Sequence, residues 1–105
     1  MTVRLSQRAL KDIQDIRSFT MERWGDAAWM RYFVGLSAAL DRAADDPASG
    51  RPRDAFLTGM RSLTYERHLI FFMPARDSGG RTAVLRIIHQ ARNLAALSYH
   101  DELEG

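Results

Sequence analysis

Cysteine is absent from the chain, lysine occurs once, and no long apolar segment is present. Without cysteine, neither a disulfide nor a thiolate metal site contributes to the fold, and a reducing, cytoplasmic setting is compatible with that composition. A membrane-spanning helix needs roughly 18 apolar residues in succession, which no part of the chain approaches, so we expect no membrane association. The three histidines lack metal-ligand spacing and clustered carboxylates, so we expect neither a metal site nor a cofactor.

The 105 residues are enough for one domain, 1–105, with one modest core. The net charge of +2 hides an uneven distribution. Residues 51–92 carry eight arginines against three acids, a surplus of +5, whereas residues 1–50 are neutral and residues 93–105 carry three acids without Lys or Arg. The basic middle segment indicates an anionic partner, either nucleic acid or an acidic protein segment. Arginine outnumbers lysine fourteen to one, which suits bidentate pairing and stacking, although GC-rich coding produces the same skew.

Two amphipathic helices are predicted in the first half of the chain. Ser6 has the side chain of an N-cap for the first helix, and Asp12 falls among the charged residues assigned to its outward side. At the joint after Trp24, Gly25 is expected to end the first helix in a left-handed conformation and Asp26 to cap the second. So tight a joint makes the helices antiparallel neighbours. The apolar positions of the first helix are Ala9, Ile13, Ile16 and Thr20.

The second helix carries the clearer apolar stripe, within about 100° of arc, and it should end before Pro47. Gly35 lies inside this helix, where it costs about 1 kcal/mol relative to alanine. A close approach by the first helix or by the sheet would explain its presence. We interpret the stripe as core, with a partner groove as the alternative, and Trp24, outside the stripe, as a binding candidate. The stripe consists of Trp29, Tyr32, Phe33, Leu36, Leu40 and Ala43.

A small sheet is predicted in the second half of the chain. The expected order of elements is strand, helix, helix, strand, strand, strand, with an optional short C-terminal helix. This order indicates an α+β domain in which the helical hairpin packs on one face of a mainly antiparallel sheet. The strand at 68–74 is apolar on both faces and is expected to be central. The expected strands lie near 2–5, 60–66, 68–74 and 82–89, with a loop over 45–53 and a turn over 77–81.

Alternation along the last strand assigns its side chains to two faces. If the helices cover the face that holds Leu85 and Ile87, Arg86 lies on the open side, where a ligand can reach it. His89 continues the apolar face and is interpreted as a core histidine, with a binding role as the alternative. Arg61 and Arg86 are the preferred binding residues, with a structural salt bridge to Glu66 or Asp77 as the alternative for each. The first face holds Ala83, Leu85, Ile87 and His89, and the second holds Val84, Arg86 and Ile88.

Six short motifs, each weak alone, form an ordered set over residues 5–92. They are Leu5-Ser-Gln-Arg-Ala-Leu-Lys-Asp-Ile-Gln-Asp-Ile16, Trp24-Gly25, Pro47-Ala-Ser-Gly-Arg51, Gly59-Met-Arg-Ser62, Arg67-His-Leu-Ile-Phe-Phe72 and Arg86-Ile-Ile-His89. Through this set the chain resembles the small bacterial toxins of the ParE branch of the RelE/ParE superfamily.

The resemblance implies the toxin of a type II toxin–antitoxin pair, neutralised in a hetero-oligomer by a ParD-like antitoxin. It further implies inhibition of DNA gyrase by binding, without catalytic residues and without sequence-specific contact to nucleic acid. Such a protein target is held by buried aromatic and arginine anchors rather than by an acid–base pair. The candidate target- or antitoxin-binding residues are Trp24, Arg61, Arg86, His89, Arg92 and Tyr99.

Two alternatives stay open. A RelE-like, ribosome-dependent mRNA endoribonuclease needs a base, an acid and cations on the scissile phosphate, whereas a family member without toxicity needs only its antitoxin-binding surface. The single lysine cannot reproduce the lysine-rich catalytic set of one RelE subgroup. The candidate groups for a ribonuclease are His68, His89 and Tyr99 for proton transfer, and Arg61, Arg86 and Arg92 for phosphate.

Overall fold

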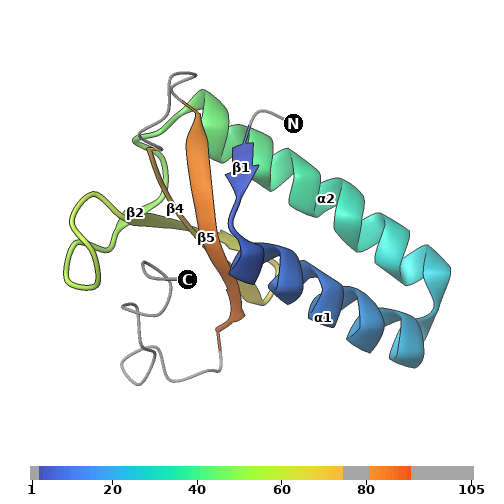
Figure 1. Ribbon diagram of the computed structural model, residues 1–105. Coiled ribbons are helices and arrows are strands. Elements are labelled where there is room, and N and C mark those ends of the chain that lie inside the picture. The colour runs from blue at the N-terminus through green and yellow to red at the C-terminus, as the bar shows by residue number, and fades with distance from the viewer. Residues whose placement is uncertain (1–2, 75–80, 91–105) are drawn as a thin grey trace.

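Two antiparallel helices cover one face of a five-stranded sheet in the computed structural model, which describes residues 3–74 and 81–90 (Figure 1). The strand order is β1-β5-β4-β3-β2, with β1 parallel to β5 and every other neighbouring pair antiparallel. The elements are β1 (Val3–Leu5), α1 (Gln7–Trp24), α2 (Asp26–Asp45), β2 (Arg51–Pro52), β3 (Arg61–Tyr65), β4 (His68–Pro74) and β5 (Thr82–His89). The predicted α+β architecture is therefore confirmed.

The sheet contains one strand more than the sequence predicts. Strand β2 lies within the segment expected to be a loop, and its Arg51 pairs with Ser62 of β3. Its second residue, Pro52, is tolerated because β2 is an edge strand, where a missing N–H breaks no inner ladder. The central position of β4 agrees with expectation, and β1 lies at the edge opposite β2. The optional C-terminal helix lies outside the described residues.

The helical hairpin begins and turns at two small residues. The Ser6 hydroxyl accepts the N–H of Ala9 at 3.0 Å, which confirms the predicted N-cap. At the joint, Gly25 has φ 87° and ψ −178°, a region nearly confined to glycine. Gly25 is itself the N-cap of α2, so the prediction that Asp26 caps this helix is wrong by one residue. Asp26 instead opens the first turn, where its charge suits the helix dipole.

Apolar side chains pack on both faces of the sheet. The helix-side cluster joins α1 and α2 to the three central strands, and it includes Leu36, Leu40, Ile70, Phe72 and Val84. The cluster on the opposite face consists of Met60, Leu69, Phe71 and Ile88, with Phe56 and Leu57 packed against it from the segment between β2 and β3. Strand β4 contributes to both clusters, which is why its sequence is apolar at every inner position.

A β-bulge between β4 and β5 breaks the alternation that the sequence predicts. Phe71 pairs with Arg86 and the next residue, Phe72, pairs with Val84, so that Leu85 is the extra residue. Val84 consequently joins Ile87 on the helix side. The assignment of Val84 to the face opposite Ile87 is therefore wrong, because strict alternation does not hold across a bulge.

Gly35 occurs in α2 because the sheet approaches the helix closely at that point. The Tyr65 hydroxyl donates a 2.9 Å hydrogen bond to the carbonyl of Tyr32, which places the phenol ring directly over Gly35. A Cβ atom at residue 35 would collide with Oη, Cζ and Cε1 of Tyr65. Close packing between helix and sheet thus offsets the helix-propensity cost of the glycine.

Replacing Gly35 with alanine should destabilise the protein by about 1–3 kcal/mol, because the added methyl group forces Tyr65 out of place. Helix propensity alone predicts the opposite sign, a gain of about 1 kcal/mol. Urea unfolding of Gly35→Ala decides between them, and Gly35→Ala combined with Tyr65→Val should recover part of the loss. Greater stability of the single variant would contradict the packing argument.

Candidate functional site

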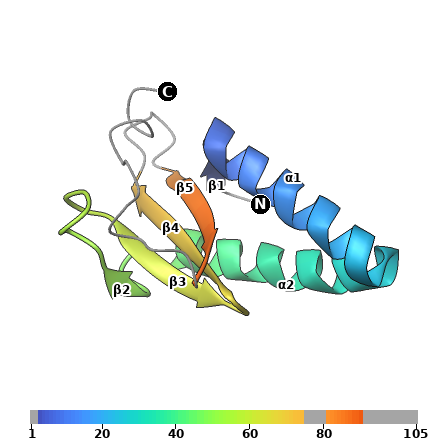
Figure 2. The same ribbon diagram turned by 90° about the horizontal axis from the view of Figure 1, so that it is seen from below.

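A groove of about 1220 Å³ lies between the helical hairpin and one end of the sheet. Figure 2 shows that the tip of the hairpin, where α1 meets α2, extends beyond the sheet. Its aromatic lining comes from Phe19, Trp24, Tyr32 and Tyr65. Arg8, Lys11, Arg31 and Arg67 are among the charged residues that line it. The groove therefore combines aromatic surface with basic side chains.

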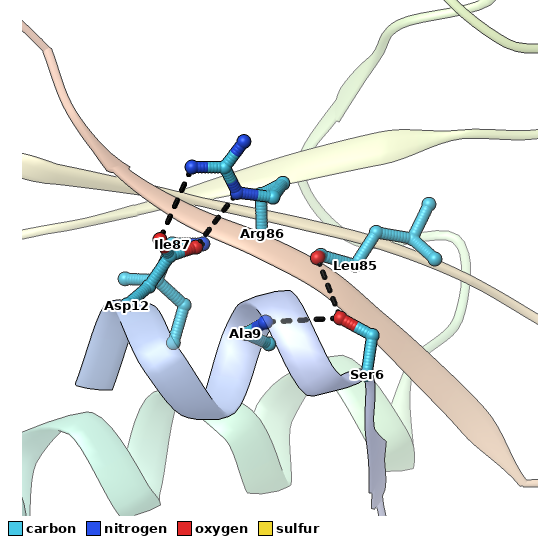
Figure 3. Close-up of polar contacts among 6 residues, drawn as sticks. All are labelled: Ser6, Ala9, Asp12, Leu85, Arg86 and Ile87. Atoms are coloured by element: carbon cyan, nitrogen blue, oxygen red, sulfur yellow. Dashed lines mark hydrogen bonds and ion pairs between the residues drawn. The ribbon is translucent and has the colours of Figure 1, made fainter. Parts of the chain in front are cut away.

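The inner wall of the groove is fixed by polar contacts between α1 and β5 (Figure 3). Strand β1 pairs with β5 only as far as Val84, so beyond that residue the edge of β5 faces α1. There the Ser6 hydroxyl donates to the Leu85 carbonyl at 2.8 Å, and the Asp12 carboxylate accepts the N–H of Ile87 at 2.9 Å. Side chains of the helix thereby take over hydrogen bonds that a longer β1 would make.

Asp12 also forms a two-pronged ion pair with Arg86. Its Oδ2 accepts the Arg86 Nε–H at 2.8 Å and its Oδ1 accepts the Nη2–H at 3.1 Å. Arg86 is 6 % exposed, so this fork–fork pair is largely shielded from water. The expectation that a ligand can reach Arg86 is therefore wrong, although the register does place Arg86 opposite Phe71, on the face away from the helices. Helical periodicity also misplaced Asp12, which borders the buried side of α1 instead of facing outward.

A tyrosine and two histidines form the floor of the groove. The Tyr32 hydroxyl and Nδ1 of His68 share a 2.9 Å hydrogen bond. His68 and His89 are cross-strand partners at the ends of β4 and β5, with ring centroids 5.3 Å apart. Burial raises the pKa of Tyr32, so its hydroxyl stays protonated. Burial, followed by the nearby His89, lowers the pKa of His68 from its usual 6.5, so His68 is neutral at physiological pH.

His89 and Trp24 occupy exposed positions on the groove. The prediction that His89 is a core histidine is wrong, because this residue lies beyond the last apolar pair of the sheet and is exposed. Trp24 is the last residue of α1 and is 65 % exposed, with its ring 5.9 Å from that of Phe19 in an edge-on contact. The guanidinium of Arg23 lies 4.7 Å from the Phe19 centroid. These residues form an open aromatic patch at the hairpin tip.

The wall opposite α1 is the two-residue turn between β3 and β4. Glu66 there has φ 53°, a left-handed conformation that costs a non-glycine residue roughly 1 kcal/mol or more. The Arg67 carbonyl accepts the N–H of Gln90 at 2.9 Å, which ties the turn to the end of β5. This strained turn positions Glu66 and Arg67 at the rim of the groove.

Of the remaining candidates from the sequence, Arg61 does not line this groove. Arg61 donates from Nε to the Ser49 carbonyl at 2.7 Å and from Nη2 to the Gly50 carbonyl at 2.9 Å, so it holds the segment before β2. These partners are backbone carbonyls and not Glu66, and Asp77, the other acid considered, lies outside the described residues. Arg92 and Tyr99 lie outside the described residues. Within the described part of the chain, no three potential metal ligands come together.

Sequence reasoning missed the roles of Asp12 and Tyr32. Asp12 carries a usable signal, since a lone carboxylate beside the apolar stripe of a helix suggests a buried cationic partner. Tyr32 carries no such signal, because its hydroxyl meets a histidine 36 residues away in the chain.

Asp12→Asn should lower the free energy of unfolding by about 3 kcal/mol, because the buried guanidinium of Arg86 loses its ion pair with the Asp12 carboxylate. Asn preserves the shape and can still accept the Ile87 N–H. The control is Asp15→Asn, which removes an exposed partner of Lys11 and should cost less than about 0.5 kcal/mol. Equal losses in urea unfolding would show that the Asp12–Arg86 pair is not a structural anchor.

His68 should titrate below 6.5 in an NMR pH titration of its ring protons, because the folded state disfavours the imidazolium. The stability linked to this group is complete above 6.5 and is lost as the pH falls from 6.5 toward the folded pKa. His68→Asn should remove that part of the acid destabilisation. In His89→Gln, the titration midpoint of His68 should move back toward 6.5. A midpoint at or above 6.5 in the wild-type protein would refute the lowered pKa of His68.

Comparison with known proteins places this fold and sequence in one family. Residues 3–94 match the family described as "ParE toxin of type II toxin-antitoxin system, parDE". Toxin ParE1 of Caulobacter vibrioides is 31 % identical over 93 residues, which cover 89 % of this chain and 93 % of that toxin. Toxin ParE1 of Mycobacterium tuberculosis H37Rv is 34 % identical over 86 residues, covering 82 % and 86 %.

The fold is also similar to a solved chain from the structure titled "Chromosomal ParDE TA system from P. aeruginosa", with a TM-score of 0.67 and 20 % identity. That match covers 85 % of this chain and 95 % of the other. Neither helix in the described residues has the length and apolar character of a membrane span. On the match over residues 3–94 and the similarity to both ParE1 toxins, the chain belongs to the ParE toxin family of type II toxin–antitoxin systems.

Proposed function

We propose that this ParE-family toxin inhibits DNA gyrase by binding to it in the cytoplasm, and that a cognate ParD-like antitoxin neutralises it in a hetero-oligomer. The observation that carries the proposal is the groove between the hairpin and the sheet, with its exposed aromatic patch and basic side chains. Tryptophan and arginine are the residue types that dominate binding energy at protein interfaces. The groove therefore has the anchors that a protein partner requires.

The aromatic patch supports a protein partner rather than a small ligand. Phe19 and Trp24 are 52 % and 65 % exposed and contact each other, so together they present apolar surface that a partner can remove from water. Arg8 and Arg67 line the same groove and suit acidic residues flanking an apolar segment. An amphipathic, acidic segment of the antitoxin or of gyrase matches this combination.

The polar side chains of the groove bond to one another, which supports a binding function over a catalytic one. Arg86 is committed to Asp12, and Nδ1 of His68 is engaged by Tyr32. A ribonuclease needs cations free to meet the scissile phosphate and a base free to meet the ribose hydroxyl. Because Arg86 and His68 are already paired within the protein, they argue against a ribonuclease active site in the groove.

The RelE-like endoribonuclease is the second candidate, and one observation favours it. His68 and His89, scattered in the sequence, come together with ring centroids 5.3 Å apart in a groove that Arg67 also lines. Two neighbouring imidazoles can serve as acid and base in cleavage of a phosphodiester. The experiments below separate this candidate from the first.

The proposal is tested by adding the purified chain to gyrase with relaxed plasmid and, in parallel, to a translating mRNA. Loss of supercoiling with intact mRNA is expected. Cut mRNA with normal supercoiling would overturn the proposal in favour of the ribonuclease, and His68→Asn should then abolish cutting. If neither activity is found, the chain is an antitoxin-binding family member without toxicity.

Trp24→Ala should weaken antitoxin binding by at least about tenfold in calorimetric titration, because it removes the largest exposed anchor of the groove. The matched control is Met30→Ala, at an apolar residue of α2 that is 54 % exposed but does not line the groove. This control should change the affinity less than about twofold, as is usual outside hot spots. Equal effects of the two variants would move the interface away from the groove.

A further inference from the structure

A second hollow, of about 310 Å³, lies on the face of the sheet away from the helices. Its lining consists of Arg51, Arg53, Ser62, Thr64, Leu69 and Gln90. Register places four of them on one face, because Arg51 pairs with Ser62, Ser62 pairs with Phe71, and Thr64 pairs with Leu69. Phe71 and Leu69 belong to the apolar cluster opposite the helices. The hollow shares no residue with the groove.

All the polar side chains that line this hollow can donate hydrogen bonds. They comprise two guanidinium groups, two hydroxyl groups and one carboxamide, and no described lining residue is acidic. Arg51 is exposed on the short edge strand β2, and it forms no ion pair or side-chain hydrogen bond within residues 3–74 and 81–90. An uncompensated positive charge beside neutral donors favours an anionic ligand.

Arg53 is held in place rather than left to move freely. Its Nε donates to the Ser62 hydroxyl at 2.8 Å, and its guanidinium carbon lies 5.7 Å from the centroid of the Phe71 ring. Ser62 is 3 % exposed and is the second residue of β3, so the hydrogen bond fixes the guanidinium to a strand of the sheet. Ordering a guanidinium before a ligand arrives lowers the entropy lost on binding.

We propose that this hollow, the arginine pocket of Arg51, Arg53, Ser62, Thr64 and Gln90, binds a phosphate group. A tetrahedral phosphate takes donors from several directions, which two arginines, two hydroxyls and an amide supply, whereas a planar carboxylate is satisfied by one guanidinium fork. The phosphate comes from one of two sources, the backbone of a nucleic acid or a phosphorylated small molecule. Both meet the same donors.

The arginine pocket goes beyond the proposed function and is independent of it. A partner bound in the groove meets the helix side and the end of the sheet, whereas the arginine pocket lies over β2, β3 and β4 on the opposite face. A toxin held by its groove therefore keeps the arginine pocket open. Variants of Arg51 should leave antitoxin affinity unchanged, which separates a failure of this proposal from a failure of the proposed function.

The test titrates the full chain with inorganic phosphate, followed by NMR, and with a fluorescent single-stranded oligodeoxynucleotide, followed by anisotropy. Arg51→Gln should weaken binding of the probe by about tenfold, the usual scale for losing a charged hydrogen bond. Its thermal unfolding midpoint should not change, because Arg51 is exposed and unpaired in the described residues. Arg53→Lys keeps the charge but loses the Nε bond to Ser62, and should weaken binding as well.

The matched control is Arg17→Gln, which removes the same charge from an exposed position on α1 that lines neither hollow. If inorganic phosphate binds and the oligonucleotide binds no more tightly, the source of the phosphate is a phosphorylated small molecule. Tighter binding of the oligonucleotide, with a salt dependence whose slope falls by about 0.7 in Arg51→Gln, identifies a nucleic-acid backbone. No saturable binding of either probe, or equal weakening by Arg17→Gln, would overturn the proposal.

Discussion

The carboxylate of Asp12 is the constraint on which the rest of the molecule depends. Because β1 is only three residues long, the edge of β5 would otherwise carry an unpaired N–H at Ile87 and a buried guanidinium at Arg86. One side chain of α1 satisfies both groups, with three hydrogen bonds between 2.8 and 3.1 Å. Through these bonds the start of α1 is fixed to the sheet, and the hairpin tip is carried beyond the sheet, where the groove opens. The same ion pair that closes the edge of β5 also neutralises Arg86, and the other basic residues that line the groove are Arg8, Lys11, Arg31 and Arg67.

The molecule presents two surfaces of different chemistry on opposite sides of one small sheet. The groove on the helix side has an exposed aromatic patch, a neutral histidine hydrogen-bonded to a tyrosine, and mixed charges. The arginine pocket on the other side has no described acid and rests on an apolar cluster that includes Phe71. Strand β4 supports both surfaces, because its side chains alternate between the two clusters. The strand between the two surfaces holds each set of side chains in place.

The elements of the fold follow from local patterns, whereas the site depends on contacts that such patterns do not encode. Helical spacing, the Ser6 cap and the apolar run at 68–74 predict the hairpin and the central strand, and Gly35 correctly indicates a close approach that Tyr65 provides. The bulge at Leu85 has no turn residue or glycine to mark it, so alternation assigned Val84 to the wrong face. Alternation also gives no sign that Asp12 covers Arg86. The pairing of Asp12 with Arg86 joins residues 74 positions apart, and that of Tyr32 with His68 joins residues 36 apart. Only tertiary packing brings such pairs together.

Hydrogen–deuterium exchange of the toxin, free and bound to its antitoxin, is the measurement that locates the partner most directly. Backbone amides in the C-terminal half of α1, the start of α2 and the turn at Glu66 and Arg67 should become protected on binding, because these segments form the groove. Amides of β2 and of the segment between β2 and β3 should keep the exchange rates of the free protein. Protection confined to β2 and that segment, with α1 and α2 unchanged, would contradict the assignment of the groove as the partner-binding surface.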